Sequence, residues 1–275
     1  MSVITLLLSM QFSELLSDYS FTTLLLIAFF ALLAGFIDSI VGGGGLIQLP
    51  ALLINLPHTP VLTVFGTNKI GSLAGTSIAA FSYSRKIKFD FRLLFVVSFF
   101  AFVSAYLGAK IVSYVPVDSL KPIILIILVA IAIFTWLKKD LGAAPAKSLS
   151  LTRQMIYGSI AATLIGFYDG FFGPGTGSFF VLAFVLILGF EFLQATAYTK
   201  IVNCITNISA LIVFIREGNY ILEIALLVAT FNIIGSFIGS HMAIRKGNGF
   251  IRVVFLVIVI LMIGKYSYDI CMNNN

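Results

Sequence analysis

The sequence has few charged residues and almost no cysteine. Charged side chains make up 10% of its 275 residues, whereas soluble domains carry about 25%, and hydrophobic residues make up 60%. The mean hydropathy of +1.09 agrees with this composition, and together these values exclude a soluble globular domain. The two cysteines, Cys204 and Cys271, lie in separate apolar segments, so we expect neither a disulfide framework nor a thiolate metal site.

The residue patterns of catalytic and cofactor sites are also missing from the sequence. Its two histidines, His58 and His241, have no partner set that would make a metal site. No Ser/His/Asp or Cys/His constellation is recognisable, and no glycine cluster has the spacing of a dinucleotide-binding loop. We therefore expect a protein that is not an enzyme and needs no cofactor. The net charge of +6 does not indicate nucleic-acid binding, because the basic residues lie in short loops between apolar runs.

Long apolar runs dominate the chain instead. A helix needs about 20 apolar residues to span the hydrocarbon core of a bilayer. Eight segments meet this requirement, namely 21–41, 60–84, 92–115, 120–137, 155–173, 195–215, 220–244 and 250–270. Two shorter apolar pieces, 46–56 and 177–190, are either short crossing helices or re-entrant ones. The sequence therefore predicts an all-α polytopic membrane protein with eight clear spans and two short segments.

The two halves of the sequence repeat each other at a constant offset of 131 residues. The stretch GFIDSIVGGGG at 35–45 recurs as GFYDGFFGPGT at 166–176, and the same offset pairs Lys69 with Lys200. One register kept over such a length indicates an internal duplication, which is common in membrane transporters. We expect a first membrane repeat, a polar linker and a second membrane repeat at residues 1–137, 138–154 and 155–275.

The basic residues predict how the repeats are oriented. Eleven of the 17 basic residues cluster near 85–92, 138–153 and 245–252, and the positive-inside tendency places all three clusters in the cytoplasm. This requires each short apolar piece to count as a crossing, so that each half has five crossings and the second half is inverted. If the short pieces instead dip in and return, the halves are parallel and the third cluster lies on the wrong side.

Each repeat places an aspartate after an apolar run and a glycine cluster after the aspartate. A glycine break frees backbone N–H and C=O groups, which a membrane tolerates only inside protein or beside a watery cavity. The helix that follows the break presents the positive end of its dipole, which attracts anions. The alternative is that the small residues only allow close helix packing. The candidate binding residues in and after the breaks are Gly42, Gly43, Gly44, Gly45, Gln48, Gly173, Gly175, Thr176, Gly177 and Ser178.

Two lysines, Lys69 and Lys200, lie within apolar runs at equivalent positions of the repeat. An ammonium group costs at least about 2.5 kcal/mol at the bilayer centre, so we expect these lysines to contact an anionic substrate. One alternative is that the lysines form structural ion pairs with Asp38 and Asp169, in which case Asp169 is the partner expected for Lys200. The other is that Lys69 snorkels to the membrane surface. The aspartates are also candidates for proton coupling. Amide donors near the lysines are Asn68, Asn203 and Asn207.

These motifs resemble those of a known family. The stretches GFIDSIVGGGGLIQLP at 35–50 and GFYDGFFGPGTGSFF at 166–180, with Thr67-Asn68-Lys69 and Thr199-Lys200, are similar to the two signature regions of the sulfite exporter TauE/SafE family, closest to its YfcA-like members. The resemblance implies a bacterial inner-membrane permease for sulfite, sulfonates or other small sulfur-containing anions. The second copy replaces the four successive glycines with Gly173-Pro174-Gly175, so the two sites cannot be identical.

A secondary transporter of small anions is the expected function, because repeats, broken helices and intramembrane charges all point to it. An anion channel is the first alternative, since positive helix ends also suit a pore. A membrane subunit of a larger ATP-driven complex is the second alternative, with its ATPase on another chain because this chain has no nucleotide-binding motif. The expected partners are the anion and the lipid bilayer, but no nucleic acid. Proton coupling and a homo-oligomer remain open.

Overall fold

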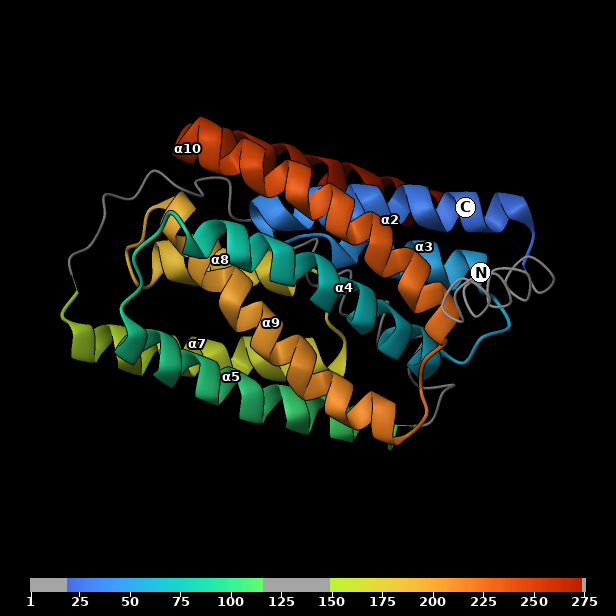
Figure 1. The fold of residues 1–275 in the computed structure, drawn as a ribbon, viewed down its shortest axis with the longest axis horizontal. Coiled ribbons are helices and arrows are strands. Elements are labelled where there is room, and N and C mark those ends of the chain that lie inside the picture. The colour runs from blue at the N-terminus through green and yellow to red at the C-terminus, as the bar shows by residue number, and fades with distance from the viewer. Residues whose placement is uncertain (1–18, 116–148, 274–275) are drawn as a thin grey trace, which may run out of the picture.

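The computed structural model describes residues 19–115 and 149–273, and these ranges contain eight helices and no strand (Figure 1). The helices are α2 (Phe21–Val41), α3 (Gly45–Asn55), α4 (Val61–Ser84), α5 (Phe91–Val112), α7 (Leu151–Phe171), α8 (Thr176–Leu186), α9 (Phe192–Arg216) and α10 (Leu222–Asn273). Helix α10 is two helices joined at Gly247, whose backbone is not helical (φ 71°, ψ −162°). The predicted span 120–137 and linker residues 138–148 lie outside the described residues.

The helices follow the predicted apolar segments closely. Both short apolar pieces form helices of their own, α3 and α8, with 11 residues each. Helix α2 ends because Gly42 adopts a left-handed conformation (φ 81°) that glycine tolerates best, and its N–H donates to the Asp38 carbonyl at 2.8 Å. The equivalent Gly173 is also left-handed (φ 98°) and follows the end of α7. Glycine therefore follows the end of both α2 and α7.

Four of the described helices are long and apolar enough by themselves to cross a membrane, namely Phe21–Val41, Phe91–Val112, Phe192–Arg216 and Leu222–Ile251. Helices α4 and α7 have 24 and 21 residues, which is equally long, but their sequences contain more polar residues and glycine. Large apolar side chains are exposed along α2, α5, α7 and α10, as expected of helices that face lipid. The count of eight spans remains a prediction.

The helices run between two ends of the bundle. The α4–α5 connection, the start of α7 and the bend in α10 lie together at the end on the left of Figure 1. We call this the basic end, because these segments carry Arg85, Lys86, Lys88, Arg92, Arg153, Arg245 and Lys246. The start of α2 and the α3–α4 and α9–α10 connections lie at the opposite end (Figure 1). The described members of the three basic clusters therefore share one end.

The direction of each helix differs between the two halves. Helices α2 and α4 run toward the basic end, whereas α7 and α9 run away from it (Figure 1). The short α3 leads to the opposite end, where Leu49, Leu52 and Leu56 join a hydrophobic cluster with Val61 and Phe65 of α4. Helix α4 thus starts at the end where α2 started, and whether 46–56 crosses the membrane or re-enters it stays a prediction.

Two hydrophobic clusters pack the bundle, one at each end. At the basic end Tyr83, Phe184 and Tyr198 are among the buried side chains, and at the opposite end Leu24 and Phe214 are. The buried polar residues of α4 and α9 lie between these clusters in the sequence of each helix. A polar layer in the middle of the bundle is therefore closed by apolar packing on both sides.

The halves also interlock through close helix contacts. Helix α2 packs on α10 and α5 packs on α7 (Figure 1). A Cβ added to Gly239 of α10 would lie 2.4 Å from the carbonyl oxygen of Phe36, and one added to Gly108 of α5 would lie 2.2 Å from that of Phe167. The two contacts are related by the repeat offset, because Gly239 lies 131 positions after Gly108 and Phe36 lies 131 positions before Phe167. Small residues allow this approach, as in other membrane helix pairs.

Candidate functional site

Two buried ion pairs cross between the halves of the chain. Lys69 of α4 places its Nζ 2.7 Å from Oδ1 of Asp169 in α7. Lys200 of α9 places its Nζ 3.0 Å from Oδ2 of Asp38 in α2. The side chains of the first pair are 5% and 3% exposed, and those of the second are 0% and 14% exposed. Each pair therefore joins one half of the chain to the other.

This pairing corrects the expectation that Lys200 would pair with Asp169. Lys200 also donates to the backbone carbonyl of Asp38, so it holds the end of α2 through two groups. The end of α2 is fixed beside α9 because Thr196, one turn before Lys200, donates to the Ile40 carbonyl at 3.4 Å. The partner of a buried lysine depends on how the two halves dock, and spacing within one half does not reveal this.

The snorkelling alternative for Lys69 is also wrong. Lys69 lies well inside α4, is 4% exposed and forms an ion pair, so its ammonium does not reach a helix end. The ion-pair alternative describes the observed contacts of both lysines. Contact of either lysine with an anion remains a prediction.

The two glycine breaks meet in the middle of the bundle. A Cβ added to Gly42 would lie 2.2 Å from the carbonyl carbon of Gly177, and one added to Gly177 would lie 2.4 Å from the Gly42 oxygen. The Ser178 N–H donates to the Gly42 carbonyl at 2.9 Å, and the Ser178 hydroxyl donates to the Val41 carbonyl at 3.1 Å. The break in α2–α3 is therefore bonded directly to the start of α8.

A small polar cavity of about 30 Å³ lies at this meeting point, with room for roughly two water molecules. It is lined by Asp38, Gly42, Gly45, Asn68, Lys69, Ser72, Thr76, Asp169, Gly173, Gly175, Thr176, Gly177, Asn203 and Asn207. Gly45 begins α3, and Thr176 and Gly177 begin α8, so the positive ends of two helix dipoles face the cavity from different halves. One cationic group, Lys69, lines it with them.

Twelve of these fourteen residues were predicted from the sequence, and five predicted residues do not line the cavity. Those five are Gly43, Gly44, Gln48, Ser178 and Lys200. Gln48 is buried and bonds elsewhere, because its Nε2 donates to the Asn68 carbonyl at 3.4 Å and its Oε1 accepts from the Asn232 amide of α10. Lys200 is fully buried behind Asp38. These side chains brace the site without facing the cavity.

Sequence reasoning missed Ser72 and Thr76, although a signal for them was present. They lie 131 positions before Asn203 and Asn207, both of which were predicted. The Thr76 hydroxyl donates to Oδ2 of Asp38 at 3.2 Å. The repeat offset, applied to every candidate residue, would have identified both. Asn232 had no such signal, because its counterpart is Ala101.

Two residues that line the cavity each have a buried acceptor atom without a hydrogen-bond partner among the described residues. Among the residues that the structure describes, neither Oδ2 of Asp169 nor Oδ1 of Asn68 has a hydrogen-bond partner, and both atoms are buried. Both residues line the cavity. Buried polar atoms in native proteins are usually paired, so two unpaired acceptors on residues of one cavity indicate a place for a hydrogen-bond donor.

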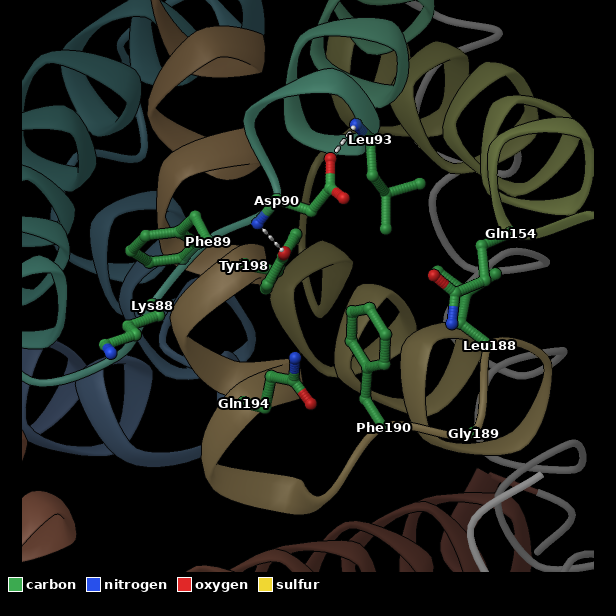
Figure 2. Close-up of a pocket in the computed structure, with 10 residues that line it drawn as sticks. All are labelled: Lys88, Phe89, Asp90, Leu93, Gln154, Leu188, Gly189, Phe190, Gln194 and Tyr198. Atoms are coloured by element: carbon green, nitrogen blue, oxygen red, sulfur yellow. Dashed lines mark hydrogen bonds between the residues drawn. The ribbon is translucent and has the colours of Figure 1, made fainter. Parts of the chain in front are cut away.

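A second, larger pocket of about 570 Å³ lies at the basic end, bordered by the α4–α5 loop, α7, the α8–α9 loop and α9 (Figure 2). Figure 2 shows Tyr198 beside Asp90, whose backbone N–H donates to the tyrosine hydroxyl at 2.7 Å. The Tyr198 ring also contacts Phe89, Phe184 and Phe190, with centroids 5.0, 6.3 and 4.9 Å away. Phe89, Phe190 and Tyr198 thus line this pocket, and Phe184 connects them to α8, which begins at the small cavity.

Known proteins resemble the chain over most of its length. The family described as sulfite exporter TauE/SafE matches residues 27–266. A probable membrane transporter protein ORF9 of Sinorhizobium sp is 38% identical over 247 residues, which cover 90% of this chain and 93% of the relative. The probable membrane transporter protein YfcA of Escherichia coli K12 is 35% identical over 246 residues, or 88% of each chain. A probable membrane transporter protein of Haemophilus influenzae is 31% identical over 236 residues, which cover 86% of this chain and 91% of the relative.

No solved structure matches the chain significantly. The relatives are named as transporters, and together with the four apolar helices they indicate a multi-pass membrane protein. The resemblance inferred from the glycine, aspartate and lysine motifs is confirmed by the family match. The chain therefore belongs to the sulfite exporter TauE/SafE family of membrane transporters.

Proposed function

We propose that the protein is a secondary transporter that carries a small anion, sulfite or a related sulfur-containing oxoanion, across the bacterial inner membrane. The observation that carries this proposal is the buried polar site, at which Lys69 and the first turns of α3 and α8 converge from both halves on one small cavity. Positive helix ends and a buried ammonium group both favour a negative charge. Amides of Asn68, Asn203 and Asn207 line the same cavity and suit the oxygen atoms of an oxoanion.

The proposed fold is a pair of inverted repeats. This proposal is supported by contacts that recur at the 131-residue offset. The two ion pairs are an example, because Lys69 corresponds to Lys200 and Asp169 corresponds to Asp38. Opposite helix directions in the two halves support it as well (Figure 1). In transporters built this way, one repeat moves against the other around a central site.

Packing on both sides of the cavity favours a transporter over a channel. The cavity of about 30 Å³ lies between two packed hydrophobic clusters, so we expect an anion to pass only when one of these clusters opens. A channel needs a continuous path at the moment of conduction. Saturable uptake and counterflow in proteoliposomes would support alternating access, whereas single-channel currents would contradict it.

The basic end is proposed to face the cytoplasm, because the described basic clusters gather there. A single cysteine in place of Lys88 at the basic end, in a protein without its native Cys204 and Cys271, should be labelled only from the cytoplasmic side. A single cysteine in place of Glu217, which follows α9 at the opposite end, serves as the matched control and should be labelled from the periplasm. The reverse pattern would overturn the orientation.

Substrate binding is tested by thermal unfolding of the purified protein in detergent with sulfite, sulfonates, thiosulfate and small carboxylates. A ligand at about 100 times its Kd stabilises a protein by about 2.7 kcal/mol, which is readily measured. Asn203→Ala, inside the cavity, should lose the shift, whereas Asn219→Ala, whose amide contacts Glu217 instead, should keep it. If no sulfur-containing anion shifts the wild-type protein, the proposed substrate class is wrong.

A further inference from the structure

We infer that Asp169 is a proton-binding site, and that a proton on its Oδ2 atom releases Lys69 to hold the transported anion. The inference rests on the proposed function and names the coupling ion of the same cavity. It predicts that the anion and one proton move together.

The geometry of Asp169 provides the first step. Its Oδ1 atom contacts Lys69 at 2.7 Å, while Oδ2 has no partner among the described residues although the side chain is only 3% exposed. Oδ1 of Asn68, next to Lys69 in the chain, is a second buried acceptor without a described partner, and it belongs to the same cavity. A protonated carboxyl group becomes a hydrogen-bond donor, which the carboxylate is not. Protonation therefore supplies the kind of group that these acceptors lack.

Charge balance provides the second step. The two ion pairs bring two positive and two negative charges into the buried layer, so its net charge is zero without a ligand. An anion that binds Lys69 must displace Asp169, and a buried carboxylate without its partner is strongly unfavourable. A proton taken from water onto Asp169 removes that charge, and Lys69 then pairs with the anion. The proton leaves Asp169 when the anion departs, so the layer stays neutral throughout.

The second aspartate is not suited to this role. Oδ2 of Asp38 already accepts hydrogen bonds from Lys200 and Thr76, and Lys200 also donates to the Asp38 backbone carbonyl. Lys200 is fully buried and does not line the cavity, so release from Asp38 would not bring it to an anion. One pair therefore exchanges partners, and the other holds the halves together.

Other titratable groups around Asp169 do not compete for the proton. Helix α8, which follows Asp169, and α3 contain no titratable side chain. Helix α5, which packs on α7, carries Arg92 and Lys110, which are exposed on the outside of the bundle, and Tyr106, which is half-buried. Among the residues described by the structure, the charged groups near Asp169 are thus Lys69 and, across the cavity, Asp38 with its partner Lys200.

The test uses the full-length protein in proteoliposomes with labelled sulfite and labelled methanesulfonate as probes. Methanesulfonate does not titrate near neutral pH, so it cannot carry the proton itself. For the wild-type protein, an imposed pH gradient should drive accumulation of the probe. Asp169→Asn should lower this gradient-driven accumulation of the probe by roughly tenfold or more, a typical size for coupled sites. Glu217→Gln, an exposed carboxylate outside the cavity, is the matched control and should behave as wild type.

A second measurement does not depend on the folding of a variant. Addition of methanesulfonate to the wild-type protein in weakly buffered detergent should remove protons from solution at several pH values around neutrality, as a pH indicator reports. Binding without proton uptake, or proton-driven accumulation by Asp169→Asn, would overturn the role of Asp169. If the wild-type protein shows neither binding nor counterflow of either probe, the proposed function itself fails, and the two failures are thereby distinguished.

Discussion

The two buried ion pairs are related by the 131-residue offset in the sequence, yet their surroundings differ. Lys200 is wholly inaccessible and bonds both the carboxylate and the backbone of Asp38, whereas Lys69 lines the cavity and bonds one oxygen of Asp169. Thr76 adds a further bond to Asp38, while Oδ2 of Asp169 has no described partner. A duplicated motif can thus supply one rigid joint and one exchangeable contact. The predictions below test this division, starting from the largest expected effect on stability.

Lys200→Met should destabilise the protein by about 3–5 kcal/mol, because it leaves the Asp38 carboxylate buried without its cation. Thermal unfolding in detergent measures the loss. The double variant Asp38→Asn with Lys200→Met should recover most of the stability, since it removes both charges. A Lys200→Met protein as stable as wild type would show that this pair is not the joint between the halves.

Gly177→Ala should cost about 1–3 kcal/mol, because the added Cβ would lie 2.4 Å from the Gly42 carbonyl oxygen, a backbone atom that cannot turn away. Thermal unfolding again provides the measurement, and helix content by circular dichroism checks that the fold is kept. Gly249→Ala is the matched control, as nothing lies within 4 Å of its added Cβ. Equal stability of the two variants would mean that the two glycine breaks are not in contact.

Lys69→Met should cost about 1–3 kcal/mol, less than Lys200→Met, because Asp169 can accept a proton at the cavity once its cation is lost. Its effect on function should be larger, with loss of the sulfite-induced thermal shift that the wild-type protein is expected to show. Lys88→Met removes a lysine at the basic end and is the control for charge alone. Retained sulfite binding by Lys69→Met would contradict contact of this lysine with the anion.

The helices and the polar centre could be predicted from the sequence because they depend on local properties. Apolar runs determine where helices lie, and the glycine clusters at 42–45 and 173–177 end one helix and begin the next. Cavity residues such as Asn68 and Asn207 were recognisable because polar side chains within membrane-spanning apolar runs are energetically costly and usually have a function. Local patterns therefore locate the site within each helix.

The contacts between halves could not be predicted in the same way. Whether Lys200 meets Asp38 or Asp169 depends on the docking of α9 against α2, which no spacing within one repeat encodes. The same holds for Gln48, a predicted binding residue that bonds Asn232 of α10. The repeat offset helps only where both copies keep a polar residue, as with Ser72 and Asn203. Packing across the interface decides the rest.

The smallest expected effect on stability concerns a pair of hydrogen bonds, one at each end of the bundle. Tyr198 accepts a hydrogen bond from the Asp90 N–H at 2.7 Å, and Thr67, 131 positions earlier, accepts one from the Ile221 N–H at 2.9 Å. Each side chain bonds the backbone of the other half near the start of a long helix, at the basic and the opposite end respectively.

Tyr198→Phe should therefore cost about 0.5–1.5 kcal/mol, the typical net worth of one hydrogen bond, while the aromatic contacts with Phe89 and Phe190 remain. Tyr157→Phe, on an exposed position of α7, is the control and should change thermal stability by less. If the Tyr198 hydroxyl also keeps the aromatic cluster closed between the pocket and the cavity, the variant should speed anion exchange at the basic end. Counterflow measured in oriented proteoliposomes separates these effects, because a stability loss alone would not raise the exchange rate. An unchanged rate would show that packing of the rings, and not the hydroxyl, closes this end.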